Sequence, residues 1–176
     1  MSKEPYVLSE KIIQTGYELV EAGQVLGTLV KLKMVGPQAQ LDFQTGLPKL
    51  DASGNKVTRE TLYLEFEVDQ KDSAGIPKRI RRYMVASVTD PRHALRQMIE
   101  DWTGNEIEPD GEGYVHANLG ELLGKTALLV VKHKQKQDGT PKHVIHKVLP
   151  TEKSYEPSVA IDNDVMSEYR EYQEAA

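Results

Sequence analysis

The chain contains no cysteine, and this absence excludes two kinds of site. Neither a disulfide framework nor a zinc site with thiolate ligands can form, and the composition agrees with a reducing cytosol. Apolar runs are also short, since none approaches the roughly 18 residues that a membrane-spanning helix requires. The first residues lack the apolar block of a signal peptide. We therefore expect a soluble protein of the cytoplasm with no membrane partner.

The sequence has little charge imbalance outside one end. Its net charge is −5, and residues 151–176 alone hold seven acids against two bases, whereas the other 150 residues hold 20 of each sign. Because this C-terminal segment is polar and poor in branched apolar residues, we expect a disordered acidic tail. Its acids could recruit partner proteins or could simply solubilise the chain. A neutral main body remains compatible with a nucleic-acid partner.

Alternating apolar and polar residues predict five strands. They are expected at residues 25–35, 62–69, 76–88, 126–134 and 142–149. The second is the clearest, with Leu62, Leu64 and Phe66 on its inner face. Residues 36–57 are rich in turn formers and predict a long loop, and residues 1–16 predict an N-terminal arm.

A short amphipathic helix is predicted at residues 91–104, between the third and fourth strands. Asp90 and Pro91 suit its start, and Gly104 suits its end. Its apolar stripe consists of Leu95, Met98, Ile99 and Trp102. Three strands, a helix and two strands form the chain order of the OB-fold, a five-stranded Greek-key barrel whose exposed face commonly binds oligonucleotides. We therefore predict a mainly β protein with an OB-fold-like barrel over residues 17–150.

Two basic segments lie in the predicted strand pairs. Residues 71–82 carry five bases and one acid, and residues 132–147 carry the same numbers. Arg79, Arg81 and Tyr83 would project from one face of the third strand, where cations neutralise phosphates and an aromatic ring stacks on a base. The same residues could instead be ordinary solvent-facing side chains, with lysines that guard a sheet edge.

Few aromatic side chains are available for stacking. The chain has one Trp, eight Tyr and two Phe, and Trp102 and Phe66 are expected in the core. Tyr63 shares its face with Glu65, an acid that repels phosphate, so Tyr83 is the better candidate. Because such a binder would rely on charge, its binding should weaken steeply with salt.

Two clusters raise the question of a metal. His133, His143 and His146 have no recognised zinc-ligand spacing, and strand alternation should turn His143 and His146 to opposite faces. These histidines could instead donate to phosphates or simply be exposed to solvent. Seven acids between residues 100 and 121 could serve a metal-dependent nuclease, but most lie in a loop, a poorly preorganised site. Without a catalytic triad or phosphate-binding glycine loop, we expect no metal, no cofactor and no enzymatic activity.

Four stretches of the sequence carry a family resemblance. They are residues 21–23 (EAG), 78–87 (KRIRRYMVAS), 95–104 (LRQMIEDWTG) and 119–131 (LGELLGKTALLVV). In this order they resemble small bacteriophage-encoded single-stranded-DNA-binding proteins with an OB-like domain, over residues 17–149. The resemblance implies non-catalytic binding of single-stranded DNA through Lys31, Lys33, Lys78, Arg79, Arg81, Arg82, Tyr83, Lys132 and Lys134.

The leading hypothesis is a sequence-tolerant single-stranded-DNA-binding protein that protects phage replication or recombination intermediates in the bacterial cytoplasm. The alternative is a protein-interaction or regulatory OB module that acts on a replication or recombination enzyme. In either case the acidic tail could contact replication or recombination proteins. The open edges of such a domain could also pair two copies of the chain into a homodimer.

Overall fold

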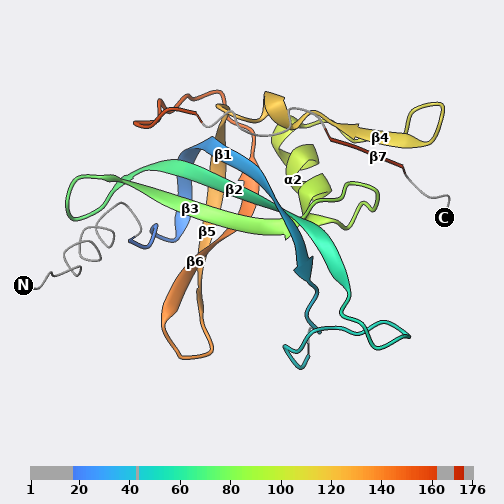
Figure 1. Ribbon diagram of the computed structural model, residues 1–176. Coiled ribbons are helices and arrows are strands. Elements are labelled where there is room, and N and C mark those ends of the chain that lie inside the picture. The colour runs from blue at the N-terminus through green and yellow to red at the C-terminus, as the bar shows by residue number, and fades with distance from the viewer. Residues whose placement is uncertain (1–17, 43, 162–168, 173–176) are drawn as a thin grey trace, which may run out of the picture.

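The fold is seen in a computed structural model that describes residues 18–42, 44–161 and 169–172. Its main element is a five-stranded antiparallel sheet with the order β3-β2-β1-β5-β6 (Figure 1). These strands are β1 (Gly23–Ala39), β2 (Thr58–Lys71), β3 (Pro77–Val85), β5 (Thr126–Gln135) and β6 (Pro141–Leu149). The predicted arm at residues 1–16 lies outside the described residues.

The chain forms the sheet by a Greek-key route. β1, β2 and β3 pair in succession, and β5 then returns to pair with β1, which is the defining step of a Greek key. The connection before β5 carries α2 (Ala94–Thr103), β4 (Tyr114–Ala117) and the 3-10 turn η1 (Leu119–Glu121). The predicted five strands, with a helix between the third and the fourth of them, are confirmed.

The sheet is not closed into the predicted barrel, because β3 and β6 remain its two edges. Cα atoms of these strands approach within 8 Å, yet the strands are not paired neighbours in the sheet. α2 contacts both of them, and residues 18–21 lie across one end of the seam, as described below. Side chains and these two segments therefore join the edges in place of a hydrogen-bonded ladder.

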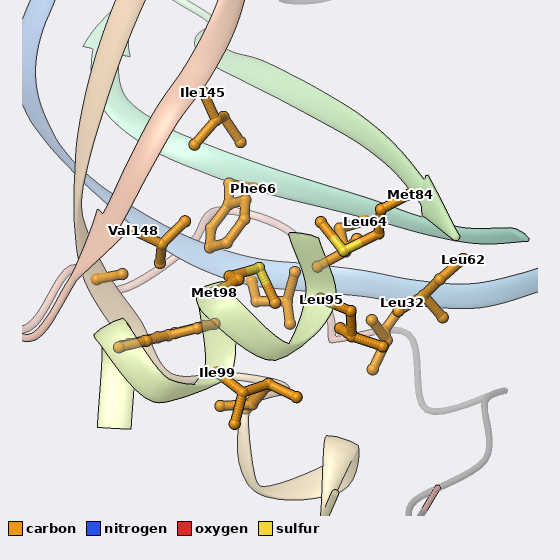
Figure 2. Close-up of a cluster of buried hydrophobic side chains, with 14 of the residues drawn as sticks. Leu32, Leu62, Leu64, Phe66, Met84, Leu95, Met98, Ile99, Ile145 and Val148 are labelled. Carbon is orange, nitrogen blue, oxygen red and sulfur yellow. The ribbon is translucent and has the colours of Figure 1, made fainter. Parts of the chain in front are cut away.

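The core lies between the inner face of the sheet and α2. Figure 2 shows the β2 side chains Leu62, Leu64 and Phe66 beside the helix. The predicted helix stripe of Leu95, Met98, Ile99 and Trp102 is buried. The rings of Phe66 and Trp102 pack with their centroids 5.7 Å apart. Because fully burying one such side chain stabilises the fold by about 1.5–3 kcal/mol, this stripe holds the helix on the sheet.

The two ends of α2 differ in how well the sequence predicts them. Gly104 ends the helix in the left-handed region, with φ 75°, as expected. The helix begins at Ala94 rather than at Pro91. Asp90 accepts a hydrogen bond from the backbone N–H of Arg92 at 2.8 Å and pairs with its guanidinium at 2.7 Å. These bonds hold the pKa of Asp90 well below its usual value, and they order the turn before the helix.

β1 is not a regular alternating strand. The register against β2 shifts at Val30, which is a β-bulge. Leu29 faces the core before the bulge and Leu32 faces it afterwards, so the alternation expected over residues 25–35 is interrupted. A Cβ atom at Gly27 would lie 2.7 Å from Leu129 Cδ1, so the residue permits close strand packing.

The predicted loop at residues 36–57 is partly strand. β1 and β2 stay paired as far as Ala39 and Thr58, and residues 40–42 and 44–57 form what we call the β1–β2 arm. Two isolated bridges order it, Leu41 with Pro48 and Leu50 with Lys56. The arm projects beyond the body of the sheet (Figure 1).

Residues 151–161, the first part of the predicted acidic tail, form a strap on the outer face of the sheet. The Tyr155 hydroxyl donates to Glu67 Oε2 at 2.7 Å, and the N–H and hydroxyl of Ser158 donate to the same carboxylate, each at 2.7 Å. The Tyr155 backbone bonds to threonine hydroxyls of β1 and β5. Burial, and then the Glu67 carboxylate, raise the pKa of Tyr155, so its hydroxyl remains a donor.

A second part of the predicted tail is also structured. β7 (Tyr169–Tyr172) pairs antiparallel with β4 in a separate two-stranded sheet. Residues 162–168 and 173–176 lie outside the described residues. For the described residues of this polar segment, β4 and the buried carboxylate of Glu67 supply the partners.

Candidate nucleic-acid interface

A groove of about 560 Å³ runs along the seam between β3 and the β5–β6 hairpin. We call it the basic groove. It is lined by Arg81, Arg82 and Tyr83 of β3, Lys132 and Lys134 of β5, and Lys142, His143, Val144, Ile145 and His146 of β6. Five of the nine residues predicted to bind nucleic acid therefore meet in one place, although they come from segments far apart in the sequence.

The basic groove is electropositive. Five Lys and Arg side chains line it, and no Asp or Glu is among its lining residues within the described part of the chain. The pKa of His146 is lowered first by Lys132, and further by burial and by Lys147, Lys134 and Arg82. A histidine that neighbouring cations push toward neutrality reports a positive local potential. Such a potential attracts polyanions.

The three β3 residues enter the groove from both faces of the strand. Arg82 lies between Ile80 and Met84 on the inner face, and burial lowers the pKa of its guanidinium. Arg81 and Tyr83 project from the outer face and are exposed. Because β3 is an unpaired edge, side chains from both faces can reach around it into the same groove.

A β-bulge at His146 explains why the last hairpin contributes two histidines. Val130 pairs with Lys147, but Val131 pairs with Ile145, so His146 is the extra residue. Consequently Ile145 and Val148, three positions apart, both face the core (Figure 2). The prediction that His143 and His146 face opposite sides assumed an unbroken alternation. With the bulge, both line the basic groove.

Tyr83 forms an exposed aromatic surface at the rim of the groove. It is 61% exposed, the setting that base stacking requires. Its ring packs against that of Tyr63 on β2, with the centroids 5.0 Å apart and the planes tilted by 55°. Tyr83 is the more accessible of the two rings, because Tyr63 is half-buried behind it.

Residues 18–21 form a clasp that ties the two sides of the seam together at one end of the groove. The carbonyl of Leu19 accepts from Lys78 Nζ of β3 at 2.7 Å. The carbonyl of Val20 accepts from His133 Nε2 of β5 at 2.6 Å. The backbone N–H of Val20 donates to His143 Nδ1 of β6 at 2.9 Å. Val20 itself is fully buried. The clasp thus fixes β3 relative to β5 and β6.

The clasp requires a neutral His143. Its Nδ1 can accept the Val20 N–H only when that nitrogen carries no proton. Burial lowers the pKa of His143, and His133, Lys78 and Arg81 lower it further. The environment therefore favours the protonation state that the hydrogen bond needs.

Four of the predicted binding residues lie outside the groove. Lys78 donates to the clasp, and Arg79 pairs with Glu65 at 3.0 Å. Lys31 and Lys33 are on β1, opposite Glu65 and Tyr63 of β2, so β2 and β3 separate them from the seam. The position of a cationic residue along a strand does not show whether its side chain already forms an ion pair with an acid.

Lys142, His143 and His146 were not among the predicted binding residues. The basic composition of residues 132–147 was the available signal for Lys142. For the histidines the sequence offered only the possibility that they donate to phosphates. It could not place His146, because the register shift that brings it into the groove depends on pairing with β5.

The histidine cluster and the acids of residues 100–121 were the other candidate sites in the sequence. Within the described residues, no group of three or more His, Asp or Glu side chains could hold a metal ion. Among the acids of residues 100–121, Glu100 pairs with Arg96 at 3.3 Å. Asp110 pairs with His116 at 2.8 Å, which, with backbone hydrogen bonds, lowers the pKa of Asp110 to about 2. No helix in the described ranges is long and apolar enough to cross a membrane.

Comparison with known proteins adds no assignment: no protein-family model matches the chain, and no curated protein matches it. The chemistry of the basic groove is therefore the main guide to function.

Proposed function

We propose that the protein is a non-catalytic, sequence-tolerant single-stranded-DNA-binding protein that uses the basic groove. The observation that carries this proposal is the meeting of five cations, with no acid in the lining, beside an exposed tyrosine. Cations along a groove neutralise a phosphate backbone, and an aromatic face stacks on bases of any identity. The resemblance to phage-encoded binders adds a role in protecting replication or recombination intermediates.

The fold supports this proposal at a second level. We infer that the sheet is an OB-like barrel opened at the β3–β6 seam, since its strand order is that of a Greek key with the helix before the fourth sheet strand. OB-folds bind oligonucleotides over strands 2 and 3 and the loops beside them. β3 and the β5–β6 hairpin, which line the groove, correspond to part of that surface.

The expected preference for single strands follows from Tyr83. In a duplex the base faces are stacked on one another, whereas unpaired bases can splay out onto aromatic side chains. A duplex would therefore use the cations of the groove but not the tyrosine. Its affinity should be lower than that of a single strand of equal length.

The direct test is a fluorescence-anisotropy titration of labelled oligo-dT and of a matching duplex at about 50 mM salt. We expect tighter binding of the single strand, and several-fold weaker binding when Arg81 is replaced by glutamine. The matched control is Arg59→Gln, an exposed arginine on β2 that does not line the groove. No binding of either probe, or equal loss in both variants, would overturn the proposal.

A second candidate, a protein-interaction module, is favoured by one observation. Leu41, Leu47 and Leu50 of the β1–β2 arm are 58%, 65% and 62% exposed. Exposed leucines grouped on a projecting element are typical of protein-binding surfaces. If the chain binds no nucleic acid, loss of a replication or recombination partner on Leu47→Ser substitution would support this reading.

A further inference from the structure

Glu65 is a buried carboxylate near the middle of β2, on the face that alternation turns toward solvent. Only 2% of the residue is exposed, and Lys31 of β1 and Arg81 of β3 are its cross-strand partners. A buried charge is costly unless donors satisfy it. Here the Tyr63 hydroxyl donates to Oε1, and Arg79 donates to Oε2 at 3.0 Å. The carboxylate is thus held from two sides.

This arrangement determines how Tyr63 supports Tyr83. The hydrogen bond to Glu65 fixes the far end of the Tyr63 ring, and the tilted contact with Tyr83, 5.0 Å between centroids, is a favourable aromatic geometry. A tyrosine on an open strand surface can occupy several rotamers. Packing against a fixed ring restricts that choice before any base arrives, which lowers the entropic cost of binding.

We propose that Glu65 is a positioning residue for base stacking: it anchors Tyr63, and Tyr63 holds Tyr83 in place as the stacking surface. This inference rests on the proposed function. The same carboxylate withdraws Arg79 from phosphate binding, because it already occupies that guanidinium. Glu65 would therefore act on bases and not on the backbone of the strand.

Charge alone makes the opposite prediction, which allows a sharp test. Removing an acid beside a polyanion-binding groove should strengthen binding if electrostatics were its only role. If Glu65 positions the tyrosines, its removal should instead weaken binding of strands that carry bases. Strands that lack bases should show only the electrostatic gain.

The experiment compares the affinities for oligo-dT and for an abasic oligonucleotide of the same length and charge. For the unaltered protein we expect a ratio of about tenfold in favour of oligo-dT, because one stacked base contributes about that much or more. Tyr83→Ala should bring the ratio near one. Glu65→Gln and Tyr63→Phe should each reduce it to about threefold, since they loosen the ring without removing it. The charge-matched control is Glu60→Gln, an exposed acid on the same strand, which should leave the ratio unchanged.

The ratio of the affinities for oligo-dT and for the abasic oligonucleotide also distinguishes a loss of ring positioning from a loss of folded protein. A partly unfolded variant loses affinity for both probes equally, so its ratio stays at the unaltered value. Tyr63→Phe keeps every charge in place and remains informative if Glu65→Gln is unstable. An unchanged ratio in both variants would overturn the positioning role while strand binding itself stands. Failure of the unaltered protein to bind either probe would instead overturn the proposed function.

Discussion

Replacing Lys132 and Lys134 with glutamine should reduce the salt dependence of strand binding by an amount that the groove geometry determines. The two lysines lie two positions apart on β5, both are exposed, and both line the basic groove. Their side chains form no part of the core, so the substitutions should leave the fold intact. The change therefore isolates their contribution to phosphate binding.

The magnitude follows from counterion release. Each phosphate neutralised on a single strand contributes about −0.7 to the slope of log K against log salt. If all five groove cations contact phosphates, the slope is about −3.5, and between about 50 and 200 mM salt the affinity falls about 130-fold. With two cations removed the slope becomes about −2.1, and the same change in salt weakens binding only about 20-fold.

The assay is anisotropy of labelled oligo-dT titrated at four or more salt concentrations. The matched control replaces Lys49 and Lys56, two exposed lysines of the β1–β2 arm that do not line the groove. It removes the same charge and should keep the slope of the unaltered protein. An unchanged slope in the groove variant, or an equal decrease in the arm variant, would refute the assignment of phosphate binding to this groove.

Three further predictions concern protonation and the strap. Burial, and then nearby positive charges, lower the folded-state pKa of His143. The contribution of neutral His143 to the free energy of unfolding is therefore fully present above the unfolded-state pKa of about 6.5. It is lost as the pH falls through the lowered folded-state pKa. Thermal unfolding should show Tm falling with acidification, and His143→Gln should flatten this trend; an equal trend in both proteins would contradict it. Lys132 is the largest cause of the lowered pKa of His146, and bound phosphates would oppose its effect. Binding of a DNA strand should therefore be accompanied by uptake of a proton, and the affinity should rise as the pH falls from about 8 to about 6. His146→Gln should weaken this dependence, and identical pH profiles would rule out the linkage. Finally, Glu67→Ala should lower the free energy of unfolding in urea by about 3 kcal/mol, because it removes the charged acceptor of three hydrogen bonds of the strap. The exposed Glu60→Ala should cost less than about 0.5 kcal/mol, and a similar cost for both would show that the strap contributes little.

The structure also shows where local patterns are sufficient and where they are not. The alternation of β2 predicted its buried face correctly, because Leu62, Leu64 and Phe66 are all buried. The same alternation turns Glu65 and Glu67 to the opposite, outer face of β2. Both are nevertheless buried, because Arg79 and Tyr63 cover one and the strap covers the other.

For the candidate binding residues, too, local sequence patterns show one part and non-local contacts decide the other. Two basic segments were evident in the sequence, and the groove draws its cations from both of them. Which cations reach the groove depends on non-local partners: Glu65 holds Arg79, the clasp holds Lys78, and a register shift against β5 brings His146 into the groove. None of these partners lies close enough in sequence to affect a local pattern.

By itself, the sequence determined where the five sheet strands and the helix lie along the chain and that a glycine ends the helix, because periodicity and backbone preference act over a few neighbouring residues. The tertiary structure alone decided that the sheet stays open at β3 and β6, that the strap packs on Glu67, and that five cations share one groove. Those outcomes depend on contacts between residues distant in the chain. Their free energy comes from burial and hydrogen bonding across segments, which no local pattern encodes.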